Sequence, residues 1–107
     1  MTYLDGNAII AKEKLTKYLL VRQQQNDKSQ FLEQAGYTLK NWQQLEQDLR
    51  KQILPLKAIP TTKTRYGQKY VIFGVLVGVN RVKLKVKTIW IVSNNTTKFV
   101  TLFPNKE

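Results

Sequence analysis

The chain contains 107 residues with no cysteine and no histidine, a length that suits one domain with one hydrophobic core. Lack of cysteine excludes disulfides and thiolate metal sites, and lack of histidine removes the commonest general base and metal ligand. Eighteen Lys and Arg against seven Asp and Glu give a formal net charge of +11, which favours a polyanionic partner.

The helical half of the chain, about residues 5–54, has the apolar spacing of three helices. Asp5 or Asn7 can cap a helix over residues 8–24, and its apolar stripe is expected in the core. The stripe consists of Ile9, Ile10, Leu15, Tyr18 and Leu19.

A second, shorter helix is predicted over residues 28–35. Asp27 can cap it, and Gly36 can end it in the left-handed conformation. Lys28 would lie in its first turn, where a positive charge opposes the helix dipole unless an anion is bound. An exposed, unpaired lysine is the structural alternative at this position.

A third helix is predicted from Thr38, as its cap, to about Ile53, with Trp42 as a core anchor. Pro55 stops it at the preceding residue. The following residues, 55–65, contain two prolines, several threonines and three basic residues. This composition predicts a mobile basic connection between the two halves of the chain.

The sheet half, about residues 66–104, alternates with the period of β-strands. Three strands are expected, over residues 69–77, 82–92 and 98–103. Gly74 suggests a bulge or a close approach to the backbone. Residues 78–81 are expected to make the first hairpin, in which Gly78 and Asn80 are able to take positive φ. The fold class predicted is therefore α+β, with about three N-terminal helices packed on a C-terminal antiparallel sheet of three or four strands.

Residues 82–92 are predicted to form the central strand of this sheet. One of its faces carries Val82, Leu84, Val86, Thr88, Trp90 and Val92. The other carries three lysines, Lys83, Lys85 and Lys87, and then two isoleucines. Such a lysine ladder either binds a polyanion or only keeps an open face soluble.

The charge excess is concentrated in the sheet half. Residues 61–107 contain nine basic residues and Glu107, a sum of +8, whereas residues 1–60 contain nine basic and six acidic residues, a sum of +3. No apolar run approaches the roughly 18 residues of a membrane span, so we expect a cytoplasmic protein that binds nucleic acid and not a membrane.

None of the strong catalytic or cofactor motifs is present in the sequence, and we expect no cofactor and no metal. The cations, tyrosines and threonines that remain suit metal-independent cleavage of RNA, in which the ribose 2′-hydroxyl attacks its own phosphate. Candidate catalytic residues are Arg65 and Lys69 as phosphate ligands, Lys28 or Tyr70 for the proton, and Thr88 and Thr101 to orient the phosphate. Candidate nucleic-acid contacts are Lys63, Tyr66, Lys83, Lys85, Lys87, Trp90 and Lys98.

Several motifs resemble an uncharacterised bacterial family, common in cyanobacteria, that is known only as a domain of unknown function. They are DKSQFLEQAGY, RYGQKYVIFGVLVG, VKTIWIV and KFVTLFP, and the resemblance covers nearly the whole chain. The closing FVTLFP strand is also distantly similar to the barnase–EndoU–colicin–RelE ribonuclease toxins. That resemblance implies a small acidic antitoxin as partner. Many of these toxins use a histidine that this chain lacks, so a toxin would need the histidine-free, RelE-like active site of lysine, arginine and tyrosine.

These observations favour a metal-independent endoribonuclease of a toxin–antitoxin pair, acting on RNA such as tRNA or mRNA. Two other functions stay open: a non-catalytic RNA- or DNA-binding module that uses the same face, and a basic domain that binds an acidic protein. All three are expected of a single domain spanning residues 1–107, and all rest on the cations converging beside Thr88 and Thr101.

Overall fold

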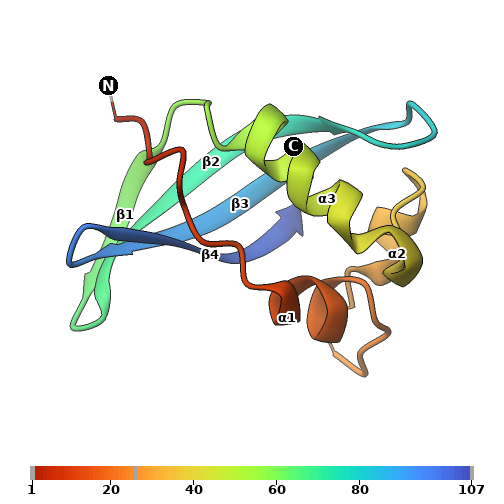
Figure 1. Ribbon diagram of the computed structural model, residues 1–107, viewed down its shortest axis with the longest axis horizontal. Helices are drawn as coiled ribbons and strands as arrows, with labels where there is room; N and C mark the ends of the chain where they lie inside the picture. The colour runs from red at the N-terminus through yellow and green to blue at the C-terminus, as the bar shows by residue number, and fades with distance from the viewer. Residues whose placement is uncertain (1, 26, 107) are drawn as a thin grey trace.

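Three short helical regions precede a four-stranded antiparallel sheet in the computed structural model, which describes residues 2–25 and 27–106 (Figure 1). The helical regions are α1 (Lys12–Lys14) with η1 (Leu15–Leu19), α2 (Ser29–Glu33), and η2 (Leu39–Asn41) with α3 (Trp42–Asp48) and η3 (Leu49–Ile53). The strands, in spatial as in chain order, are β1 (Ile59–Thr64), β2 (Gly67–Val77), β3 (Lys83–Ser93) and β4 (Thr96–Pro104). The predicted α+β class is confirmed.

The hydrophobic core lies between the helices and one face of the sheet (Figure 1). Its fully buried side chains come from both halves of the chain: Leu15, Leu32, Leu45, Leu49 and Ile53 from the helical half, and Ile72, Leu76, Val86, Trp90 and Leu102 from the sheet. Within the described residues, no helix is long and apolar enough to cross a membrane.

The first helix is shorter than predicted, because residues 8–10 are extended. The backbone of Ile9 donates a hydrogen bond to the carbonyl of Thr97 and accepts one from Phe99, both at 2.8 Å. This pairing with the edge of β4 satisfies the polar backbone groups that a helix would otherwise satisfy. Ile9, predicted in the core, is therefore 48% exposed. Tyr18, also predicted in the core, lies within η1 but is 60% exposed, so both are corrections to the predicted stripe.

Asp5 also does not cap a helix, since its carboxylate accepts a hydrogen bond from the backbone of Asn7 at 2.9 Å within a turn. The remaining members of the predicted stripe, Ile10, Leu15 and Leu19, are buried as expected.

The two later helices agree more closely with the sequence. Asp27 accepts hydrogen bonds from the backbone and the hydroxyl of Ser29, and Gly36 has a φ of 85°. The third helical region ends at Ile53, before Pro55. Trp42 is half-buried at the margin of the core, and the centroid of its ring lies 5.1 Å from the ammonium of Lys12.

Residues 55–65 are not the mobile connection that the sequence predicted. Residues 59–64 form the edge strand β1, in which Ile59 lies opposite Val71 and Thr64 opposite Gly67. An irregularity between Pro60 and Lys63 interrupts the pairing. The strand fits the β-branched residues of this segment, and the proline is tolerated because β1 is at the edge.

Gly74 and Gly78 both allow a close approach of helical residues to the sheet. A Cβ atom at Gly74 would lie 2.8 Å from methyl groups of Ile53 and Leu56, which confirms the expected close approach. A Cβ at Gly78 would overlap the carbonyl oxygen of Ala35. The hairpin lies between β2 and β3 as predicted, and its positive φ belongs to Arg81, at 71°, and not to Gly78 or Asn80.

Candidate nucleic-acid interface

The strand pairing divides the side chains of the sheet between two faces. In register, Phe73 lies opposite Lys87 and Lys87 opposite Phe103, whereas Ile72 lies opposite Thr88. Successive side chains of a strand point to opposite faces, so these two sets lie on opposite faces. We call the helix-covered one the inner face and the other the outer face; on the outer face Val71 is buried, and the other side chains are partly or largely exposed. The outer face carries Lys69, Val71, Phe73, Val75, Val77, Lys83, Lys85, Lys87, Ile89, Ile91, Lys98, Thr101 and Phe103.

The outer face carries positive charge without negative charge. No acidic residue occurs between Asp48 and Glu107 in the sequence. Over residues 2–25 and 27–106, the ion pair present joins Arg50 to Glu46 at 3.1 Å, on the helical side. The lysines of β2, β3 and β4 thus add their fields over one surface, as a site for a polyanion requires.

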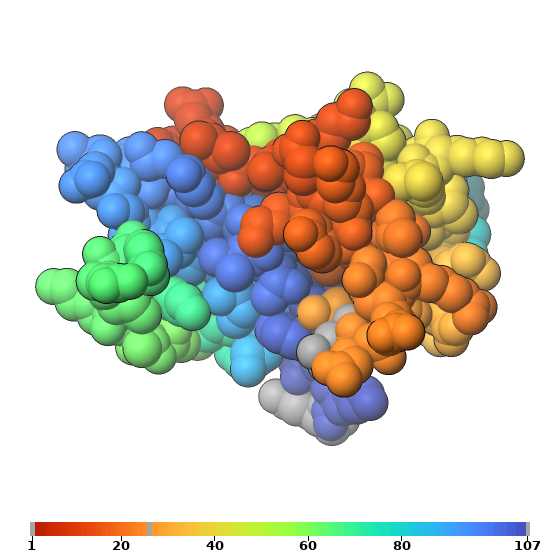
Figure 2. All heavy atoms as spheres, turned by 90° about the horizontal axis from the view of Figure 1, so that it is seen from below, coloured from red at the N-terminus to blue at the C-terminus, as the bar shows by residue number. Residues whose placement is uncertain are grey.

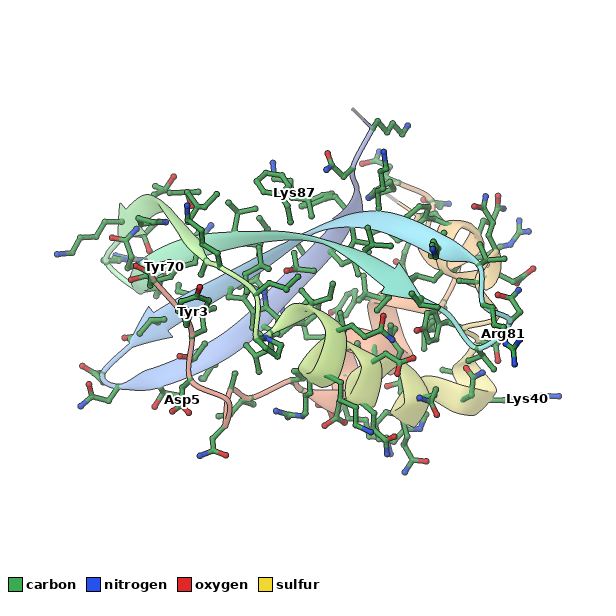
Figure 3. The ribbon with its side chains drawn as sticks, turned by 90° about the horizontal axis from the view of Figure 1, so that it is seen from above. Tyr3, Asp5, Lys40, Tyr70, Arg81 and Lys87 are labelled. Atoms are coloured by element: carbon green, nitrogen blue, oxygen red, sulfur yellow. The ribbon has the colours of Figure 1, made fainter. Side chains whose placement is uncertain are left out.

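Exposed aromatic rings lie among these lysines. Phe73 and Phe103 are 43% and 38% exposed, and they flank Lys87 across three neighbouring strands. Figure 3 shows Lys87 on the side of the sheet away from α3. The outer face therefore combines cations with ring surfaces onto which nucleobases can stack.

Lys28 reaches this face from the start of α2. Its ammonium donates a hydrogen bond to the hydroxyl of Thr101 at 3.4 Å and lies 4.3 Å from the ring centroid of Phe103. Partial burial lowers the pKa of Lys28 below its usual value, because desolvation disfavours the charged form. Hydrogen bonds from the backbone and the hydroxyl of Ser29 to the Asp27 carboxylate hold the backbone on either side of this lysine.

A cavity of about 310 Å³ opens between η1 and β4, next to Lys28. In β4 the pairing shifts between Ile89 and Trp90, so that Val100 is an extra, bulged residue beside Thr101. A bulge re-aims neighbouring side chains, and Val100 and Thr101 both line the cavity. Figure 2 shows the orange atoms of the N-terminal helical segment directly beside the blue atoms of β4.

A family model described as Domain of unknown function (DUF6883) matches residues 5–106. The chain belongs to this family. The predicted membership of an uncharacterised family is thus confirmed, whereas the similarity to ribonuclease toxins stays a prediction. No curated protein and no solved structure matches the chain.

Thr88 and Trp90 of this DUF6883 chain lie on the inner face, where they cannot contact a polyanion, and their assignment to the site is corrected. Both are fully buried. The hydroxyl of Thr88 donates to the carbonyl of Ile72 at 3.0 Å and accepts a hydrogen bond from the Trp90 indole at 2.8 Å. The ring of Trp90 packs edge-on against Phe99, 5.2 Å between centroids. These two residues have structural roles.

The predicted convergence beside Thr88 and Thr101 is also corrected, because these two threonines lie on opposite faces. Tyr70 lies opposite Trp90 in the register and packs against the core from the inner face, beside Tyr3 (Figure 3). It is therefore separated from Lys69, its neighbour in sequence, which is on the outer face.

Arg65 and Tyr66 form a separate pair in the turn between β1 and β2. The Arg65 guanidinium donates to the Tyr66 hydroxyl at 2.7 Å and lies 4.9 Å from the ring centroid. Tyr66 lines a shallow hollow with Lys98, at the end of β4 away from Phe103. Lys63 is exposed on the edge strand β1. The structure thus joins Lys28 to Thr101 and Tyr66 to Lys98, at two ends of the outer face.

Sequence reasoning by residue type missed Phe73, Phe103 and Lys14. Phe73 and Phe103 share the outer face with the lysines, which period-two alternation places together once the strands are paired. Lys14 lines the cavity beside Lys28, a contact between elements that no local pattern indicates. No group of three or more His, Cys, Asp or Glu suited to a metal ion occurs among the described residues.

Proposed function

We propose that the outer face binds single-stranded RNA. The observation that supports this proposal is the placement of Lys87 between the exposed rings of Phe73 and Phe103, next to further lysines, on a face whose strands carry no carboxylate. Binding of an acidic protein would require the positive charge but not the exposed rings. A face that only keeps the protein soluble would not require exposed rings beside the lysines. Unstacked bases need both, with phosphates on the lysines and bases on the rings.

The spacing of the lysines suits an extended strand. Lys83, Lys85 and Lys87 follow one another at every second residue of β3, about 6.6–6.8 Å apart along the strand. This separation allows successive phosphates of an extended single strand to meet successive ammonium groups. Stacking of a base on a ring such as Phe73 contributes roughly 1–3 kcal/mol and is tolerant of sequence. Affinity is therefore expected to be salt-dependent and weakly sequence-specific.

The test is binding of a labelled single-stranded RNA by fluorescence anisotropy at several salt concentrations. The variant Lys83→Gln/Lys85→Gln/Lys87→Gln removes three charges from the outer face. Its control, Lys40→Gln/Lys51→Gln/Lys57→Gln, removes three exposed charges outside that face. We expect the first variant to lower the salt slope by about 2, at roughly 0.7 per phosphate contact, and the second to leave it nearly unchanged. Equal losses would show that only net charge matters.

A second candidate function is metal-independent cleavage of RNA, as in the toxin of a toxin–antitoxin pair. The observation that favours it is the contact of Lys28 with Thr101 beside a cavity, with the pKa of the ammonium lowered by burial. In this proposal Lys28 transfers the proton and Thr101 positions the phosphate. The 2′-hydroxyl gives its proton to the neutral Lys28 amine and forms a bond to phosphorus, and the bond from phosphorus to the 5′-oxygen breaks. The 5′-oxygen takes up the proton from Lys28 and leaves as a hydroxyl, and a 2′,3′-cyclic phosphate remains.

Cleavage is tested by incubating RNA with the protein in the presence of a chelator and analysing the product ends. Fragments ending in 2′,3′-cyclic phosphate, lost in Lys28→Met but kept in Lys40→Met, would support the enzyme. If the RNA is bound but stays intact, the chain is a non-catalytic RNA-binding module and the cleavage proposal fails.

The toxin proposal implies a cytoplasmic location and a small acidic antitoxin that covers the outer face. A protein of this kind, encoded next to the chain, would compete with RNA for the same lysines. If it binds while RNA does not, at moderate salt, the chain is a basic protein-interaction domain and the RNA proposal fails.

A further inference from the structure

We infer that the cavity between η1 and β4 binds a terminal phosphate monoester, presented either by the end of an RNA strand or by a free nucleoside monophosphate. The inference rests on the proposed function only for the RNA source of the group. The cavity is separate in structure from the stretch of lysines on β3, since it is lined by helical residues and by the bulge of β4.

The charge of the cavity suits a dianion. Lys14 and Lys28 enter it from two different elements, and no carboxylate is among its described lining residues. The acidic residue next to Lys28, Asp27, is engaged by the backbone of Gln23 and by Ser29. Hydrogen bonds, chiefly the one from the Ser29 hydroxyl, lower the pKa of Asp27 below its usual value, so Asp27 is ionised and already has partners.

Two donors of the cavity lie close to each other. The Lys28 ammonium and the Thr101 hydroxyl are 3.4 Å apart, so an oxygen of a phosphate can accept from both. The bulge at Val100 brings this hydroxyl to the cavity, a local distortion typical of binding sites. The phosphate would therefore sit between the start of α2 and the bulge.

The size and the walls of the cavity suit a phosphate that carries a nucleoside. Its volume of about 310 Å³ is at the lower end of small-ligand sites, which run from about 300 to 1,000 Å³. Leu19 is buried and gives it an apolar wall, and Tyr18 at its margin is 60% exposed. An exposed tyrosine ring contributes little to the hydrophobic core, but it offers a surface on which a base can stack.

Lys28 connects the cavity to the outer face, because it lines the first and covers the ring of Phe103 on the second. A strand lying along the outer face would therefore end with its terminal phosphate in the cavity. A phosphodiester in mid-strand carries a single charge and two ester chains, and it would fill this site less well than a monoester.

The experiment measures binding of one single-stranded RNA sequence with a 5′-hydroxyl, a 5′-phosphate or a 3′-phosphate end, and binding of AMP against adenosine. We expect one phosphorylated end to increase affinity by about tenfold, the lower range for a hydrogen bond to a charged group. Lys14→Gln and Lys28→Gln should remove this gain. Lys17→Gln on the same helix and Lys40→Gln should keep it. Circular dichroism checks that each variant is folded.

The outcomes separate this inference from the proposed function. Equal affinity for all three RNA ends, with no difference between AMP and adenosine, would overturn the inference while RNA binding stands. AMP binding that depends on Lys14 and Lys28, without any RNA binding, would support the phosphate site and overturn the proposed function. A gain from the terminal phosphate that persists in Lys28→Gln would also overturn the site.

Discussion

The inner and outer faces of the sheet are made by the same strands but have different chemistry. On the inner face, Ile72, Val86 and Trp90 are fully buried, and the hydroxyl of Thr88 has two hydrogen-bond partners. On the outer face, Lys87 lies between the exposed rings of Phe73 and Phe103, and the lysines lack carboxylate partners in the described strands. The comparison shows that the face of a side chain, more than its residue type, decides whether it serves the core or a ligand.

The largest expected effect is the loss of Trp90. Trp90→Ala removes a fully buried indole from the centre of the core and should lower the free energy of unfolding by about 3–5 kcal/mol. Phe73→Ala, its control on the outer face, should lower it much less and weaken RNA binding instead. Urea denaturation measures the first effect and anisotropy the second. Equal destabilisation by the two variants would contradict the division of the sheet into two faces.

The close packing that covers the inner face can be tested at Gly78. Gly78→Ala places a methyl group against the carbonyl of Ala35 at the end of α2, and should cost about 1–3 kcal/mol by overpacking. Gly6→Ala is the matched control, because an added Cβ there meets nothing within 4 Å. Thermal unfolding of both variants decides the point. If Gly78→Ala unfolds at the same temperature as the original protein, the backbone around Ala35 and Gly78 can shift to accept the methyl group without loss of stability.

Thr88→Val and Thr101→Val place the same substitution on the two faces. At Thr88 it leaves the buried Trp90 indole without its acceptor, at a cost of about 1–3 kcal/mol. At Thr101 it removes a hydroxyl from a half-buried position near solvent, so we expect little change in stability and a loss in phosphate affinity. Denaturation should show a loss of stability only for Thr88→Val, and binding measurements should show a loss of phosphate affinity only for Thr101→Val. The same result for both variants would refute the assignment of the two threonines to opposite faces.

Much of the sheet could be predicted because its signal is local. Alternation in residues 82–92 correctly separated the lysines from the residues that are buried. The same alternation already placed Thr88 and Trp90 on the face opposite the lysines. Selecting site residues by chemical type ignored that placement, and for this reason the predicted site mixed the two faces.

The remaining errors concern contacts between distant parts of the chain. The backbone of Ile9 leaves the helical conformation to pair with Thr97 and Phe99, and no nearby residue indicates this. Residues 59–64 became a strand because β2 offers its edge to them. The cavity beside Lys28 depends equally on a bulge in β4 and on Lys14 of α1, which are far apart in sequence.

The smallest effect, and the most specific for the outer face, is expected for a single lysine. Lys87 lies between Phe73 and Phe103, so Lys87→Gln removes one cation from the middle of the proposed RNA path. The slope of log K against log salt should fall by about 0.7, while the free energy of unfolding stays within about 0.5 kcal/mol of the original. Lys51→Gln, an exposed charge of the helical half, should change neither quantity. Since both variants lower the net charge equally, a slope that changes in both would show that the RNA senses the whole molecule and not this face.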